Sequence, residues 1–79
     1  MTIKVRIFGY LTKRSEGSYT EERTIRVPSR CTLEALLDEV GIEQNEDVIF
    51  FVNNRIAAHR NEALREHDKV WIYPVMGDG

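Results

Sequence analysis

One segment in the middle of this chain carries the complete pattern of an amphipathic helix, and it limits what the rest can fold into. Thr32 has a side-chain oxygen that can cap a helix N-terminus. Gly41 suits the left-handed position that ends a helix. Between them, apolar residues recur at the i, i+3, i+4 and i+7 positions of one face, namely Leu33, Leu36, Leu37 and Val40. This pattern predicts a short helix that must bury one face against something else. Its acidic residues, Glu34, Asp38 and Glu39, then face solvent.

The rest of the apolar pattern is typical of β-strands. Thr2–Tyr10 and Arg23–Val27 alternate apolar with polar residues, the period of a half-buried strand. Val48–Val52 is apolar on both faces and rich in β-branched and aromatic residues, which predicts a strand. We predict a short return strand over Arg55–Ala57 and a last strand over Lys69–Tyr73.

Proline and asparagine mark the breaks between these segments. Pro28 has no N–H to donate and ends the second strand, and we expect Pro74 to stop the pairing of the last one. Asn53 and Asn54 can supply a positive-φ turn. The stretch 11–22 is polar and is expected to be a long connection between the first two strands.

This order of elements predicts an α+β fold, with one main helix packed on one face of a small mixed sheet. The long path between the first and last strands allows them to pair in parallel, which places the last strand at the centre of the sheet. That is the layout of a β-grasp domain. With 79 residues the chain forms one domain. We assign residues 1–74 to it and expect 75–79 to be a flexible C-terminal tail.

Composition excludes several classes of function. The net charge of −2, with both signs intermixed, gives no basic stripe for nucleic acid. The longest apolar run, Val48–Val52, is too short to span a bilayer, and the N-terminus has no signal-peptide pattern. We therefore expect a soluble cytoplasmic protein that is monomeric when free.

Cysteine and histidine usage argues against a metal site. The single cysteine, Cys31, excludes an internal disulfide, a Cys-x-x-Cys zinc site and a four-cysteine cluster. His59 and His67 have no further ligand at a recognisable spacing. We predict no metal and no cofactor.

The C-terminal stretch "PVMGDG" is the strongest functional feature of the sequence. Its two glycines, Gly77 and Gly79, remove the side chains that would keep a chain end out of a narrow site. Val75 and Met76 precede them as an apolar pair that either grips a partner or simply covers the sheet edge. Asp78 places a carboxylate between the glycines.

Taken in order, four stretches make the chain resemble the ThiS and MoaD sulfur-carrier family of ubiquitin-like β-grasp proteins. They are "VRIFGYL", "CTLEALLDEVGI", "VIFFVNNR" and the closing "LREHDKVWIYPVMGDG". The last is similar to the pattern L-x-x-G-D-x-V-x-x-x-P-x-x-x-G-G. Two residues depart from it, because His67 and Asp78 stand where the family usually has glycine.

The resemblance implies a carrier rather than an enzyme, with no catalytic residue of its own. In this family an ATP-dependent adenylating enzyme of the ThiF or MoeB type activates the carboxylate of the last glycine, here Gly79. Sulfur transfer then gives a thiocarboxylate, which a sulfur-accepting synthase uses in thiamin or molybdopterin-type cofactor synthesis. The tail residues Val75, Met76, Gly77 and Asp78 would be presented to these partners.

Two other interpretations stay open on the sequence alone. The chain could be a β-grasp interaction module or small regulatory subunit whose tail is never activated. A small enzyme with Cys31 as nucleophile is a third possibility, because a helix N-terminus can stabilise a thiolate. Tyr73 and Trp71, on the face opposite Val70 and Ile72, could extend a docking patch, or could be ordinary cross-strand packing.

Overall fold

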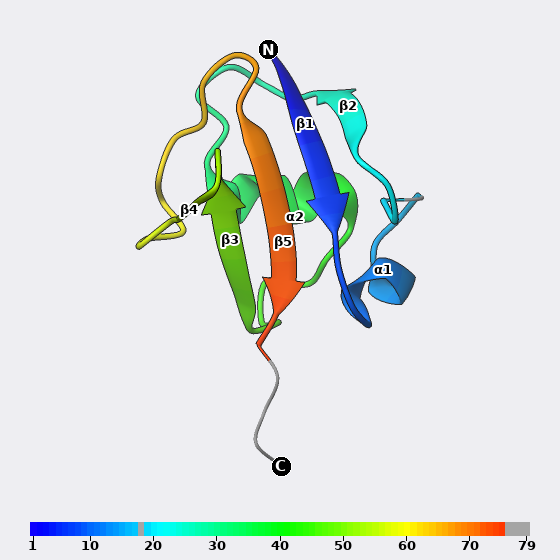
Figure 1. Ribbon diagram of the computed structural model, residues 1–79. Coiled ribbons are helices and arrows are strands. Elements are labelled where there is room, and N and C mark those ends of the chain that lie inside the picture. Colours follow the sequence, from blue (N-terminus) through cyan, green and yellow to red (C-terminus); the bar gives the residue numbers. More distant parts are fainter. Residues whose placement is uncertain (18, 76–79) are drawn as a thin grey trace.

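The computed structural model describes residues 1–17 and 19–75. Figure 1 shows the elements of this part of the chain, which in order are β1 (Thr2–Ile7), α1 (Leu11–Arg14), β2 (Arg23–Arg26), α2 (Leu33–Val40), β3 (Val48–Val52), β4 (Arg55–Ile56) and β5 (Lys69–Pro74). The strands form a single mixed sheet in the order β2-β1-β5-β3-β4. β1 and β5 pair in parallel and the other neighbours are antiparallel. The predicted α+β fold and the central position of the last strand are confirmed.

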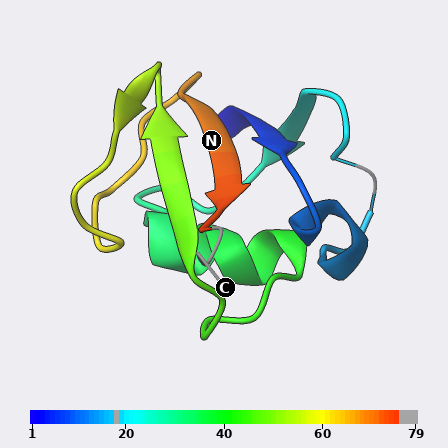
Figure 2. The ribbon, with the colours of Figure 1, turned by 60° about the horizontal axis from the view of Figure 1, so that its bottom comes forward.

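Helix α2 lies across one face of this sheet, as Figure 2 shows. The Thr32 hydroxyl accepts a hydrogen bond from the Ala35 N–H at 3.1 Å, and Gly41 closes the helix at φ 81°. The apolar face is fully buried, with Leu33, Leu36, Leu37 and Val40 all at 0 % exposure. Opposite them lie the inward side chains of the central strands, Ile3, Val5, Ile7, Val70 and Ile72. The core is thus one apolar layer, and the other face of the sheet has no helix of the described chain over it.

The connection after β1 differs from the prediction. β1 ends at Ile7 rather than Tyr10, because Gly9 adopts φ 65° and turns the chain into the single-turn helix α1. Within the stretch expected to be a polar loop, Leu11 and Tyr19 are buried in the core. An isolated apolar residue in a polar stretch carries no periodicity, so pattern alone could not place these two.

The last strand also continues further than predicted. Pro74 pairs with Val48, and the Val75 N–H donates to the Asp47 carbonyl at 3.1 Å. Opposite β3, residue 74 falls at a position where the antiparallel ladder needs no N–H from it, so proline is tolerated there. The predicted positive-φ turn is confirmed at Asn53 (52°) and Asn54 (70°).

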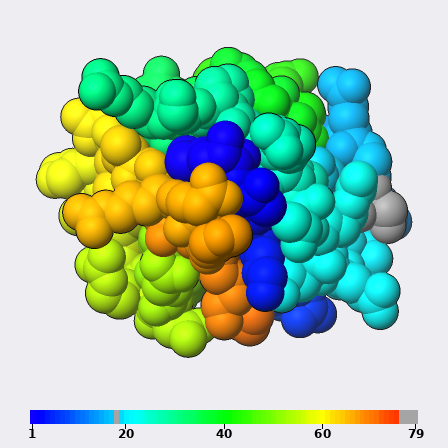
Figure 3. Space-filling model, turned by 90° about the horizontal axis from the view of Figure 1, so that it is seen from above, coloured from blue at the N-terminus to red at the C-terminus, as the bar shows by residue number. Residues whose placement is uncertain are grey.

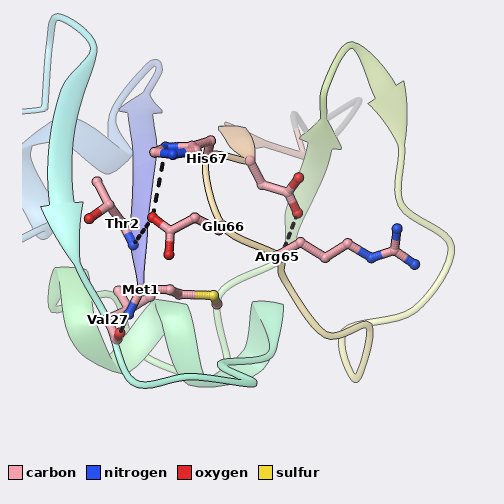
Figure 4. A network of polar contacts seen from close by, with 7 residues as sticks. Met1, Thr2, Val27, Arg65, Glu66 and His67 are labelled. Carbon is pink, nitrogen blue, oxygen red and sulfur yellow. Dashed lines mark hydrogen bonds and ion pairs between the residues drawn. The ribbon is translucent and has the colours of Figure 1, made fainter.

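Hydrogen bonds hold together the end of the sheet at which β1 and β5 begin. Figure 3 looks onto this end, where the first residues lie beside the segment leading into β5. The Glu66 carboxylate accepts from the Thr2 N–H at 2.9 Å (Figure 4). The His67 N–H donates to the Thr2 carbonyl at 2.7 Å. The Val27 N–H donates to the Met1 carbonyl at 2.9 Å. At this end, hydrogen bonds therefore join the start of β1 both to Val27 and to the segment before β5.

Candidate functional site

The site that the sequence predicts lies mostly beyond the described residues. Met76, Gly77, Asp78 and Gly79 lie outside them, so the roles predicted for these residues remain predictions. Val75 is the last residue described, and its side chain is 44 % exposed. What the structure defines is the base of the tail and the surface around it.

The tail continues the central strand of the sheet. β5 lies between β1 and β3 (Figure 1). On the β1 side the Phe8 N–H donates to the Ile72 carbonyl at 2.9 Å. The next donor of this parallel ladder would be residue 74, a proline without an N–H. On the β3 side pairing continues through Val75 and Asp47. The chain is thus released from β1 one residue before it leaves β3.

Gly9 lies directly against the proline at the base of the tail. A Cβ added to Gly9 would be 2.8 Å from Cγ and 3.2 Å from Cδ of Pro74. Such separations are well inside van der Waals contact. The close approach of ring and backbone therefore depends on glycine.

Polar contacts brace the loop before β3, which carries Asp47. Arg60 donates to the carbonyls of Gln44 at 2.8 Å and Glu46 at 2.6 Å. The Glu46 carboxylate accepts from Arg14 Nη1 at 2.8 Å, which ties the loop to α1. Arg60 thus links this loop to the segment after β4.

Aromatic rings cover the centre of the open sheet face. Phe8 stacks on Tyr73 with centroids 4.2 Å apart and planes 4° from parallel, and it also contacts Trp71 at 5.3 Å. Phe51 meets Tyr73 edge to face at 5.3 Å. Ile56, paired with Phe51, is 65 % exposed. Trp71 and Tyr73 face away from Val70 and Ile72 as predicted. Phe8 and Phe51 were not singled out from the sequence, although alternation from Ile7 and Phe50 places them outward.

Cations lie beside these rings. The Arg6 guanidinium carbon is 4.4 Å from the Phe8 ring centroid, and Lys69 Nζ is 5.1 Å from that of Trp71. Lys4 pairs with Lys69 across the β1–β5 ladder and is exposed. We call the rings Phe8, Phe51, Trp71 and Tyr73, together with Ile49, Ile56, Lys4, Arg6 and Lys69, the open face. It is apolar toward the tail and β4, and basic toward β1.

The structure argues against a nucleophilic role for Cys31. Its side chain is buried, and its Sγ lies 3.4 Å from the Thr32 carbonyl oxygen. Burial, and then the Glu39 carboxylate, raise the pKa of this thiol. The sequence suggested that the helix N-terminus could stabilise a thiolate, but desolvation works in the opposite direction.

Other features that could carry a function are a metal-binding cluster, a membrane-spanning helix or a pocket. Within residues 1–17 and 19–75, no group of three or more His, Cys, Asp or Glu side chains could hold a metal ion. No helix in this part of the chain is long and apolar enough to cross a membrane. An open hollow of about 320 Å³ lies beside β4, lined in part by Arg55, Glu62 and Asp68. Its Asp68 carboxylate already accepts from Asn53 Nδ2 and the Arg65 N–H.

These features define a class: a ubiquitin-like β-grasp domain whose central strand carries one side of an apolar and basic face and is followed in the sequence by a glycine-containing tail. The family follows from comparison of the whole chain. The ThiS family model matches residues 5–79, so the chain belongs to the ThiS family. Members of this sulfur-carrier family are small carrier proteins rather than catalysts.

Solved structures with the same fold include subunits of molybdopterin converting factor and a small archaeal modifier protein. A chain from Pyrococcus furiosus described as molybdopterin converting factor subunit 1 is 24 % identical, with a TM-score of 0.72 over 95 % of this chain and 98 % of that one. SAMP1 from Haloferax volcanii is 18 % identical, with a TM-score of 0.71 over 100 % of both chains. A complex of subunits 1 and 2 of molybdopterin-converting factor from Helicobacter pylori contains a chain 22 % identical, with a TM-score of 0.60 over 100 % of both chains. No curated protein sequence matches this chain.

Proposed function

We propose that this protein carries sulfur on its C-terminus. An ATP-dependent adenylating enzyme joins the Gly79 carboxylate to AMP and releases pyrophosphate. Hydrosulfide from a sulfur donor then attacks the acyl carbon and AMP leaves with the electron pair of the broken C–O bond. The thiocarboxylate that remains is used by a sulfur-accepting synthase of thiamin or molybdopterin-type synthesis. The observation that supports this most, beyond family membership, is that Pro74 and Val75 continue the central strand beside β3 and have no backbone hydrogen bond to β1.

This chemistry assigns the catalytic groups to the partner. A carboxylate is a poor electrophile until it is converted to a mixed anhydride with phosphate, and glycine allows the chain end to enter a narrow site. Among the described residues, the one cysteine is buried with a raised pKa. The protein is therefore a substrate in this scheme rather than an enzyme, acted on in trans by a ThiF- or MoeB-like protein.

The open face is the surface that suits such a partner. Rings such as Phe8 and Trp71 give large contact areas, and exposed apolar residues beside a functional terminus favour association. The charged outward side chains of the described β1 and β5 strands, Lys4, Arg6 and Lys69, are all cationic. We assign this face to an adenylating enzyme whose docking surface is apolar at its centre and acidic at its rim. Val75, Met76, Gly77 and Asp78 then lead Gly79 into its active site.

Asp78 requires a feature of that partner. Its carboxylate would lie near the phosphates of ATP, where an unpaired negative charge costs several kcal/mol to desolvate. A partner that supplies Lys, Arg or backbone N–H groups to Asp78 would accept this tail, and an enzyme shaped for Gly-Gly would reject it. Asp78 is thus proposed as a specificity element.

One residue, Asp78, favours a second function. If no partner accommodates Asp78, the protein is a β-grasp interaction module or small regulatory subunit with an inactive tail. The open face would serve that role equally well. A C-terminal extension distinguishes the two, because a carrier needs the free Gly79 carboxylate and a module does not.

The test is ATP–pyrophosphate exchange with the adenylating enzyme of the same organism. Three chains are compared: the natural tail, Asp78→Gly, and a chain that ends at Asp78. We expect exchange with the natural tail and none without Gly79. Exchange by Asp78→Gly alone would mean that the natural tail has lost the chemistry. Absence of exchange from all three chains would favour the interaction module.

A further inference from the structure

The end of β1 has a glycine at a point where the fold leaves no room for a side chain. Gly9 has φ 65°, and a Cβ on it would lie 2.8 Å from Cγ of Pro74. The pyrrolidine ring is fixed to its own backbone and cannot swing away as a long side chain can. A side chain at residue 9 would therefore have to displace the backbone of Pro74, at the base of the tail.

At Pro74 the backbone of β5 stops pairing with β1 and remains paired with β3 alone. Its missing N–H ends the ladder with β1 after the bond from Phe8 to Ile72. The bond from Val75 to the Asp47 carbonyl, 3.1 Å long, continues the pairing with β3. The ring resting on Gly9 and this hydrogen bond both help to hold Pro74 and Val75 in the direction of β5.

We propose that Gly9 is a positioning residue for the tail, an inference that rests on the proposed carrier function. The contact of its backbone with Pro74 sets where the chain leaves the sheet, and the bond from Val75 to Asp47 sets its direction. Gly9 touches no reacting atom. It acts through Pro74 on the path that Gly79 takes from the docked domain to ATP.

Substitution of Gly9 needs a control for backbone strain, and the chain provides one. Gly17 also has a positive φ, 94°, but a Cβ there would meet Arg23 Nη1 at 2.9 Å and Tyr19 Cε2 at 3.5 Å, and no atom of Pro74. Gly9→Ala and Gly17→Ala thus both place an alanine at a positive φ, which costs folding free energy. Only Gly9→Ala disturbs the base of the tail.

The experiment measures exchange kinetics with the adenylating enzyme and amide hydrogen exchange in the free protein. For Gly9→Ala we expect kcat to fall about 10- to 100-fold with KM for the carrier nearly unchanged, because the open face still docks while Gly79 is misplaced. The Val75 amide should exchange faster, with the Trp71 amide in the middle of β5 unchanged. A merely structural role would act differently, since partial unfolding lowers the concentration of folded carrier and raises the apparent KM.

Three further variants make the result decisive. Gly17→Ala should leave kcat and the Val75 amide at natural values. Pro74→Ala removes the ring but restores an N–H that can pair with β1, so it is measured alone as the reference for Gly9→Ala combined with Pro74→Ala. These two chains should have nearly equal kcat values, because without the ring a Cβ at residue 9 no longer overlaps Pro74. The proposal is overturned if Gly9→Ala matches Gly17→Ala in both measurements, or if Gly9→Ala lowers kcat as much in the Pro74→Ala chain as in the natural chain. If the natural chain is not activated, the carrier function fails, and the Val75 amide still decides whether Gly9 positions the tail.

Discussion

At the scale of single residues, His67 has a backbone conformation that is unusual for a residue with a side chain. His67 adopts φ 69°, a conformation that glycine enters freely and that other L-residues enter at a cost of about 1 to 2 kcal/mol. The family pattern usually has glycine here, and the structure supplies the physical reason. In this conformation the His67 backbone N–H donates to the Thr2 carbonyl at 2.7 Å.

We predict that His67→Gly stabilises the domain by roughly 0.5 to 1 kcal/mol, since relief of backbone strain exceeds the added freedom of the unfolded chain. The exposed contact between His67 Nδ1 and Glu66, 3.7 Å long, contributes little. Urea unfolding measures the change, with His59→Gly as the control at a residue without positive φ. A destabilised His67→Gly chain would contradict this account.

Cys31 gives the domain a predictable response to alkaline pH. Burial raises the pKa of this thiol in the folded protein. An unfolded cysteine loses its proton at about pH 8.5, whereas the folded one still holds it, so the folded state binds more protons in this window. The contribution of Cys31 is complete below about pH 8.5 and declines as pH rises through the folded pKa.

The expected result is a steeper loss of unfolding free energy above about pH 8.5 for the natural chain than for Cys31→Ala. Denaturant unfolding curves at a series of pH values give the unfolding free energy of both chains. The contributions of lysines and tyrosines are common to the two chains and cancel in the difference. Parallel pH dependences for the two chains would show that the Cys31 thiol titrates normally.

Among the helices and strands, those with a clear hydrophobic period could be predicted from the sequence. Those that depend on one or two buried residues could not. Helix α2 was predictable because cap, stripe and terminal glycine agree, and β3 because it is short, apolar and β-branched. Helix α1 was not, because one turn has no periodicity and Leu11 is its only buried residue. The Phe8–Tyr73 stack brings together residues far apart in sequence and depends on the parallel register of β1 and β5.

Helix α2 should be the main stabilising element. We predict that Leu36→Ala costs about 2 to 4 kcal/mol because it leaves a cavity under the helix, and that Thr32→Ala costs about 1 kcal/mol through loss of the cap. Glu34→Ala, on the solvent side, is the control and should be nearly neutral. Denaturant melts test this. Equal stability of all three variants would contradict the packing described.

The open face should bind its partner by charge as well as by apolar contact. Arg6→Glu reverses one cation beside Phe8 and should weaken binding to the adenylating enzyme about tenfold or more, mainly through slower association. Arg30→Glu changes net charge equally at an exposed site outside the open face and is the matched control. Binding kinetics at two salt concentrations measure both. Equal effects of the two variants would count against docking through this face.

For the whole molecule, the fold was predictable and the site only in part. Fold class follows from the order of strands and helix, which leaves few arrangements for so short a chain. The position of the site at the end of β5 follows from the tail sequence. The shape of its base does not, because the contact of Gly9 with Pro74 and the bond from Val75 to Asp47 join segments distant in sequence.

The intact mass of the protein isolated from its own cells tests the carrier function most directly. Replacement of one oxygen of the Gly79 carboxylate by sulfur adds about 16 mass units. Because methionine oxidation adds nearly the same mass, fragmentation must place the change on Gly79. We predict a fraction of molecules with sulfur there that is lost when the adenylating enzyme is deleted. An unmodified Gly79 under conditions of active cofactor synthesis, with the enzyme present, would contradict the carrier function.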